Sequence, residues 1–275
     1  MIDPIPEFVD TTNQVTARAP AESSVLTRRF PARPESFSFE PSQRWVRGVV
    51  DGTAIVDSFS QFLIWEPRAK VPEYMYPREH VRTDLLVPSE PGPGPQRYFR
   101  PATRDVEWFD LVLGDRRIHQ VAWRWLVPGL EDYLSVSWYY DVLDDWFEED
   151  EPVHTHPRDP YNRVDAIPSS RHVTVTGPDG SVLAETTAPV LVYETGLPTR
   201  YYIPASDVHL DSLTPLAQWT SCPYKGFAND HWSLPGNEAP VAWSYSAPTP
   251  NLRSIAGYIA FYQDGTVISV DGETS

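Results

Sequence analysis

Hydrophobic and polar residues alternate along much of the chain, most regularly in RHVTVTGPDGSVLAET. Val173 and Val175 are two positions apart before an Asp-Gly turn signal, and Val182 and Ala184 are two positions apart after it. A period of two is typical of a β-strand, whose successive side chains point to opposite faces. Similar runs are PVLVYET, VAWSYS and IAGYIAFYQDGTVISVDG, and the Asp-Gly pair at 264–265 predicts another hairpin. We therefore expect short antiparallel strands, and the 29 prolines oppose long helices.

This pattern occurs twice. The stretch 51–81 and the stretch 179–208 both run Asp-Gly, an alternating apolar segment, an aromatic-Glu pair, a proline, tyrosines, a second proline and a final valine. Glu66 corresponds to Glu194, 128 positions later, and VAWRW (121–125) corresponds to VAWSY (241–245). A solenoid needs three or more short units. The sequence therefore predicts an all-β protein with two homologous compact antiparallel β domains in tandem.

The repeat sets the expected domain boundaries. We expect an extended or partly disordered N-terminal arm at 1–43, a divergent first β domain at 44–149, a Pro/His-rich linker at 150–170 and a second β domain at 171–275. The acidic run DDWFEEDE is followed by His154 and His156. A solvated face is the favoured interpretation of these acids, because their spacing matches no strong metal-ligand template, and no metal site is predicted.

Composition limits the setting and the partners. The single cysteine cannot form an internal disulfide, which favours a reducing compartment, and we expect a cytoplasmic protein. The first residues carry acids where a signal peptide carries positive charge, and no stretch approaches the roughly 18 apolar residues of a membrane span. A net charge of −16 disfavours phosphate backbones and anionic lipid surfaces. We expect no nucleic acid, no membrane, no cofactor, and a monomer or homodimer.

The cysteine lies in TSCPYKGFANDHW and is the first candidate for chemistry. The positive charge of Lys225 would favour a thiolate at Cys222, and Pro223 and Gly226 predict a rigid loop. Free cysteine is also among the most buried residue types and often fills core space as a small hydrophobe. From the residues alone, a buried filler is favoured over a ligand-contacting thiol, and a catalytic nucleophile comes third.

Other residues are candidate partners of this loop. His231 could act as a base, although a structural histidine is favoured. Glu194 and Glu66 each end an apolar strand, where a carboxylate needs a salt bridge, a hydrogen bond or a pocket to face. The tyrosines of YYIP alternate, so that one faces the core and the other is exposed or lines a pocket. Core packing is favoured for the aromatic residues; the alternative is a ligand pocket lined by Tyr202, Trp243, Tyr224 and Gly226.

The second half, from about Arg171 to Gly272, resembles the domain of unknown function 427 family. The resemblance rests on Glu194, YYIPASDV, TSCPYKGFANDHW, VAWSYSAPTPNLRSIAGYIAFY and the closing VDG. The family pattern has a strand Glu, then Tyr-Tyr-x-Pro-Arg-x-Asp-Val, Cys-Pro-x-Lys-Gly and Ala-Trp-x-Tyr. The resemblance implies compact single or tandem β domains. A nucleotidyltransferase-like label attached to the family has no support in this sequence, where neither a metal-binding acidic pair nor a phosphate cradle is evident.

The two copies depart from this pattern in complementary ways. The second copy has Ala205 where the pattern has arginine, whereas the first keeps that arginine as Arg78 but has RYFRPATRD in place of Cys-Pro-x-Lys-Gly. One hypothesis is a composite site, because arginine pairs well with anions. Decay of the first copy is the alternative. The composite site would combine Arg78 and Glu66 with Cys222, Lys225 and Glu194.

Three functions are compatible with these residues. The first is binding of a small polar or anionic ligand in a pocket near Cys222 and Lys225. The second is a cysteine-dependent enzyme, with Cys222 as nucleophile or redox thiol, Lys225 favouring the thiolate, and Glu194 or His231 as acid or base. The third is a structural or partner-binding protein. The sequence names no substrate.

Overall fold

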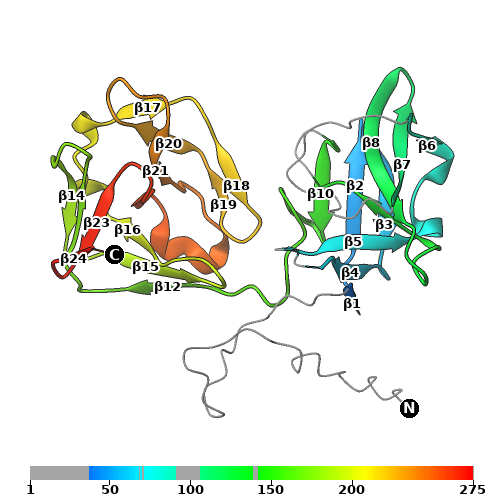
Figure 1. The fold of residues 1–275 in the computed structure, drawn as a ribbon, viewed down its shortest axis with the longest axis horizontal. Helices are drawn as coiled ribbons and strands as arrows, with labels where there is room; N and C mark the ends of the chain where they lie inside the picture. Colours follow the sequence, from blue (N-terminus) through cyan, green and yellow to red (C-terminus); the bar gives the residue numbers. More distant parts are fainter. Residues whose placement is uncertain (1–36, 68, 70, 91–105, 139–141, 275) are drawn as a thin grey trace, which may run out of the picture. The chain divides into compact units, whose positions relative to one another are not determined.

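The computed structural model describes residues 37–67, 69, 71–90, 106–138 and 142–274. The chain divides into two compact units, Met1–Pro157 and Arg158–Ser275 (Figure 1). Each unit contains one antiparallel sheet of seven strands and one of four. None of the helices among the described residues is long and apolar enough to cross a lipid bilayer.

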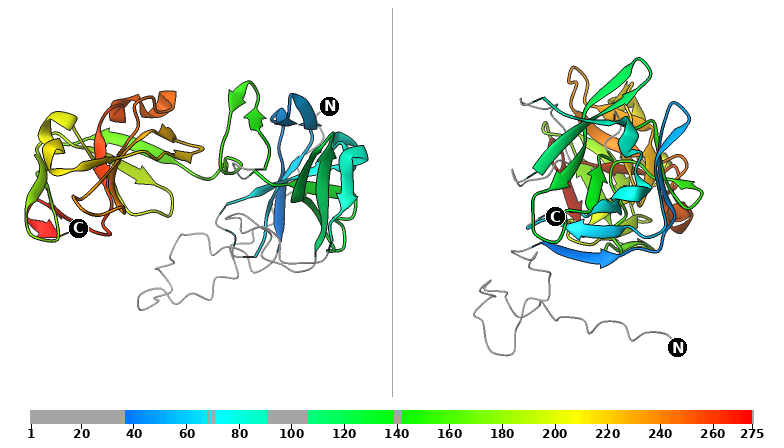
Figure 2. Two further views of the ribbon diagram at one scale, coloured as in Figure 1. Left: turned by 90° about the horizontal axis from the view of Figure 1, so that it is seen from above. Right: turned by 90° about the vertical axis from the view of Figure 1, so that its right-hand side faces the viewer.

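The first unit supplies β1 to β11. Its large sheet has the order β1 (Ser38–Pro41), β4 (Phe62–Trp65), β5 (Glu73–Pro77), β9 (Tyr133–Val136), β8 (Arg116–Trp125), β7 (Val106–Leu113) and β6 (Leu86–Pro88). Its small sheet has the order β11 (Glu151–Pro152), β10 (Asp145–Glu148), β2 (Val46–Val50) and β3 (Thr53–Ser58). The green strands β7 and β8 form the long hairpin of this unit (Figure 2).

The second unit has the same strand order. Its large sheet runs β12 (Val164–Pro168), β15 (Val190–Glu194), β16 (Arg200–Ile203), β22 (Ile259–Phe261), β21 (Pro240–Ser244), β20 (Asp230–Ser233) and β17 (Thr214–Leu216). Its small sheet runs β24 (Glu273–Thr274), β23 (Val267–Val270), β13 (Val173–Thr176) and β14 (Val182–Thr186). Eleven strands therefore match one to one, and the predicted tandem of antiparallel β domains is confirmed.

An isolated bridge supports the same alignment. Val56 pairs with Val81 in the first unit, and Ala184 pairs with Val208 in the second. These bridges link the small sheet to the segment that follows β5 or β16. The internal repeat seen in the sequence therefore reflects equivalent positions in the two folds.

The Asp-Gly turns behave in two ways. Asp51 and Gly52 have φ of +47° and +71° and join the paired strands β2 and β3, as expected for a two-residue hairpin with positive φ at both positions. The prediction of a hairpin at Asp264 and Gly265 is wrong. These residues connect β22 of the large sheet to β23 of the small sheet, which are not paired. An Asp-Gly pair indicates that the chain turns, but it does not indicate whether the two flanking strands pair with each other.

Each large sheet has two apolar faces. One face packs against the small sheet and forms the main core, which includes Tyr201 in the second unit. The opposite face, called the outer face below, carries a second cluster that includes Tyr202, Trp243 and Tyr245. The two adjacent tyrosines thus face opposite sides and the Trp243–Tyr245 pair shares one side, as their spacing predicts.

Two edge strands lie in segments that the sequence assigned elsewhere. β1 falls within the predicted arm and β12 within the predicted linker, and each is the first strand of a large sheet. An edge strand pairs on one side only, so a short segment such as SFEP can join a sheet without a strong alternating pattern. Residues 1–36 of the predicted arm lie outside the described residues.

Candidate functional site

The Cys-Pro-Tyr-Lys-Gly motif forms a small hairpin in the second unit. Its strands are β18 (Thr220–Cys222) and β19 (Gly226–Ala228), and Cys222 pairs with Gly226. The Lys225 amide donates to the Cys222 carbonyl at 3.2 Å and closes the turn. Gly226 has φ of +95°, a conformation that L residues with a Cβ rarely adopt. The backbone conformation at Gly226 therefore explains why a glycine ends this turn.

The backbone of this turn is held by neighbouring segments. Arg158 Nε donates to the Pro223 carbonyl at 2.9 Å. Thr249 Oγ1 donates to the Tyr224 carbonyl at 2.7 Å, and the Thr249 amide donates to the Lys225 carbonyl at 3.1 Å. Every carbonyl from Cys222 to Lys225 thus accepts a hydrogen bond. Hydrogen bonds from two other parts of the unit therefore hold these peptide groups, and the rigidity of the loop stays a prediction.

Lys225 and Glu194 form a buried ion pair. Lys225 Nζ donates to Glu194 Oε2, and the two side chains are only 12% and 11% exposed. Asn162 Nδ2 contacts the other carboxylate oxygen at 3.4 Å. Burial lowers the pKa of Lys225, but the nearby charges of Cys222 and Glu194 outweigh burial and raise it overall. The ammonium therefore stays charged in the folded protein.

Cys222 is neither sealed in the core nor fully exposed. Its residue surface is half-buried. The Lys225 ammonium interacts electrostatically with the thiol but is hydrogen bonded to Glu194. The favoured interpretation of the sequence, a buried filler, therefore describes the structure only in part. Cys222 thus lies near a charged amine and a carboxylate and keeps part of its residue surface exposed.

Aromatic side chains lie next to this ion pair on the outer face. Trp243 Nε1 donates to the Tyr202 hydroxyl at 3.3 Å. Burial raises the pKa of Tyr202 to about 12, although the Lys225 charge acts in the opposite direction. The Tyr224 hydroxyl accepts from the Asp159 amide at 2.7 Å. Tyr202 and Trp243 are buried rather than open to solvent, and a ligand pocket lined by them stays a prediction.

The structure does not place His231 with the thiol. His231 is 1% exposed, and its Nε2 lies 3.3 Å from Thr220 Oγ1. Burial lowers its pKa, which favours the neutral ring. Among the described contacts, no hydrogen bond joins His231 to Cys222 or Glu194. The structural interpretation of this histidine is therefore the better one.

The first-unit members of the composite site occupy equivalent positions. Arg78 is exposed and begins η2 (Arg78–His80), and Ala205 begins the matching η4 (Ala205–Asp207). Glu66 is 7% exposed and directly follows β4, and Glu194 is the last residue of β15. A site shared between the units stays a prediction. The RYFRPATRD stretch lies outside the described residues.

The two linker histidines have local roles. His156 is buried and its Nδ1 lies 2.7 Å from the Pro157 carbonyl. Burial lowers the pKa of His154. Within the described ranges, no group of three His, Cys, Asp or Glu side chains is arranged to hold a metal ion.

Several residues that support the hairpin were not predicted. Arg158, Asp159 and Asn162 come from the segment assigned to the linker, and Thr249 comes from SAPTPN. Sequence patterns provided little indication of these residues, because most of their contacts involve a backbone group, and such contacts do not require one particular residue type. The SAPTPN stretch was nevertheless part of the family resemblance.

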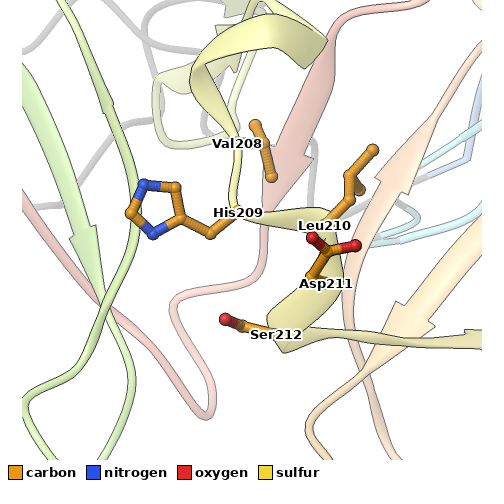
Figure 3. Close-up of a pocket in the computed structure, with 5 residues that line it drawn as sticks. All are labelled: Val208, His209, Leu210, Asp211 and Ser212. Carbon is orange, nitrogen blue, oxygen red and sulfur yellow. The ribbon is translucent and has the colours of Figure 1, made fainter.

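A separate open depression lies elsewhere in the second unit. It is lined by residues 208–212, which include η5 (Leu210–Ser212). Figure 3 shows the His209 ring and the Asp211 carboxylate extending to opposite sides of the chain. His209 Nδ1 lies 3.0 Å from the Val182 carbonyl, which occupies that ring nitrogen. None of the lining residues belongs to the predicted site.

Comparison with known proteins identifies the repeated unit. A search of curated proteins gives no match to the chain. A family model described as "Domain of unknown function (DUF427)" matches twice, at residues 38–149 and 165–275. The first match spans β1 to β10, and the second spans β12 to β24 except for the first residue of β12. The chain therefore belongs to the DUF427 family and carries two copies of its domain in tandem.

Proposed function

We propose that the second unit binds a small polar or anionic molecule at the Lys225–Glu194–Cys222 cluster. The observation that carries the proposal is the buried ion pair. Taking two charges out of water costs free energy, and apolar residues of similar volume often serve stability as well or better. A buried pair that packing alone does not require is therefore a candidate for recognition.

The chemistry of the pair indicates the class of ligand. An ammonium group has three N–H donors, and Lys225 Nζ makes one hydrogen bond within the described structure, to Glu194. The remaining donors suit a carboxylate or phosphate oxygen. Glu194 balances the charge, so the site favours a ligand with both donors and acceptors over a bare anion. Tyr202 supplies a neutral hydroxyl beside the pair.

A ligand screen tests this proposal. The full chain is screened by thermal shift against small carboxylates, phosphates and amino acids, because a ligand that binds the folded state raises the melting temperature. We expect a shift with the wild type that Lys225→Met abolishes. Arg171→Met is the matched control, since it breaks an exposed ion pair to Asp271 in the same unit. Shifts that survive Lys225→Met, or a screen without shifts, would refute the proposal.

A cysteine-dependent enzyme is the second candidate. The half-buried position of Cys222 beside Lys225 and Glu194 supports it, because a nucleophilic cysteine needs a partly exposed site with polar groups nearby. The chain has one cysteine, so mass spectrometry reports its alkylation without ambiguity. Fast reaction of the native protein with iodoacetamide, reduced by Lys225→Met, would support an enzyme. A thiol that reacts only after denaturation would exclude it.

A further inference from the structure

The outer faces of the two units differ at equivalent positions. In the second unit, Tyr202 and Trp243 both pair with Ala260, which places them in one row across three strands. In the first unit, Met75 and Trp123 both pair with Ser135 in the same arrangement. Met75 therefore takes the place of Tyr202, and Trp123 takes the place of Trp243.

This exchange leaves the buried indole N–H of Trp123 without an acceptor among the described residues, and a second buried indole N–H, that of Trp125, lies on the same face. Trp243 Nε1 donates to the Tyr202 hydroxyl, whereas Met75 offers no oxygen to Trp123. Trp123 and Trp125 are 1% and 0% exposed, and neither indole nitrogen has a hydrogen-bond partner among the described residues. A buried N–H without a partner costs about 1–3 kcal/mol. Two such groups on one sheet face call for an explanation.

A buried carboxylate lies on the same face. Glu73 pairs directly with Ile64 on the neighbouring strand, and directly paired residues share a face. Ile64, Met75, Trp123 and Trp125 form one apolar cluster there. In the second unit the position of Glu73 is occupied by Arg200, whose guanidinium lies 5.7 Å from the Trp243 ring centre. The first unit thus has an acid where the second has a cation.

Glu73 is unusual for a buried acid. It is 9% exposed and, among the described residues, has no hydrogen bond or ion pair. Burial, and then the charge of Glu66, raises the pKa of Glu73 to about 8. Carboxylates in such surroundings attract a cation, because pairing restores the ionised form.

We propose that the outer face of the first unit, formed by Glu73, Trp123 and Trp125, binds a small ammonium compound that also carries a hydrogen-bond acceptor. The cationic nitrogen would pair with the Glu73 carboxylate and lie against the indole rings, which attract cations. The acceptor would take the free indole N–H. An amino alcohol is the simplest molecule with both groups.

Calorimetric titration of the full chain with ethanolamine tests the proposal. Ethylamine lacks the acceptor and ethylene glycol lacks the charge, so both should bind at least 10-fold more weakly. Tris is avoided because it is itself an amino alcohol. Glu73→Gln should weaken ethanolamine binding at least 10-fold. Glu107→Gln is the control, because Glu107 is a half-exposed acid of the same unit, paired with Arg124.

A second variant tests the site in case Glu73→Gln impairs folding. Met75→Tyr copies the second unit and gives Trp123 a hydroxyl acceptor, so it should weaken binding while keeping a folded chain. Absence of ethanolamine binding by the wild type would overturn the proposal, as would binding that is unchanged in Glu73→Gln. If ethanolamine bound instead at the Lys225 cluster, its binding would be unchanged in Glu73→Gln. The Glu73→Gln variant therefore separates this site from the site proposed in the second unit.

Discussion

The buried ion pair of the second unit gives a quantitative prediction. Lys225→Met removes the ammonium and leaves the Glu194 carboxylate, which is 11% exposed, with the 3.4 Å contact from Asn162 Nδ2. Removing one partner of a buried pair typically costs about 3–5 kcal/mol, because the other charge stays buried without compensation. We expect the lower end of this range, since the carboxylate can still reach some water.

Two further variants separate charge from packing. Glu194→Gln keeps a side-chain oxygen that accepts from Lys225 Nζ, so it should cost less than Lys225→Met. The double variant buries no unpaired charge. Its cost should fall below the sum of the single costs by about 0.5–3 kcal/mol, the range measured for interacting neighbours.

The assay is urea unfolding of the full chain at neutral pH, followed by circular dichroism and compared with calorimetry. The matched control is Arg171→Met, because Arg171 and Asp271 are about half exposed and solvent screens their charges. A Lys225→Met variant as stable as Arg171→Met would refute the assignment of a tightly coupled buried pair.

Three other predictions concern single positions. Gly226→Ala places a Cβ at φ of +95°, which should lower the free energy of unfolding by about 1–3 kcal/mol; an unchanged urea midpoint would contradict it. Gly48→Ala would set a Cβ 2.7 Å from the Trp146 ring, and overpacking should cost about 1–3 kcal/mol in thermal unfolding, whereas wild-type stability would show that the ring moves freely. Glu73 has its pKa raised to about 8 by burial and by Glu66, so the folded state holds a proton that the unfolded state releases at lower pH. Its stabilising effect is therefore complete in acid and is lost as the pH rises toward 8, by at most about 1.4 kcal/mol per pH unit; urea titrations should show that Glu73→Gln flattens this dependence, and an unaltered profile would contradict the assignment.

Local sequence patterns predicted the strands well where buried apolar positions alternate with exposed polar positions. The alternation around Val173 and Val175 predicted β13 because these valines pack in the main core. The repeat offset predicted that Glu66 and Glu194 end matching strands. Edge strands such as β1 were not predicted, because a strand that pairs on one side only shows weak alternation of apolar and polar residues.

The candidate site was predicted in its members but not in its contacts. Lys225 is three residues from Cys222, and this proximity suggested that the ammonium would serve the thiol. The ammonium instead bonds to Glu194, 31 positions away. Such a contact depends on how the hairpin packs on the sheet, which no local spacing specifies. The neutral, buried state of His231 likewise depends on tertiary packing.

Comparison of the two units shows which contacts the fold keeps in both copies. Ser58 Oγ lies 2.9 Å from His80 Nδ1 in the first unit, and Thr186 bonds to Asp207 at 2.6 Å at the equivalent place in the second. The residues differ but the hydrogen bond is present in both, as expected for a contact that the fold itself requires.

The outer faces show the opposite behaviour. The hydroxyl that accepts from Trp243 has no counterpart beside Trp123, and a cation in one copy stands where the other has Glu73. A change that only preserved packing would not bury two indole donors and a carboxylate that have no partner in the described part of the chain, because each costs stability. The outer faces are therefore where the two copies differ in chemistry, with Glu73 in the first unit at the position that Arg200 occupies in the second.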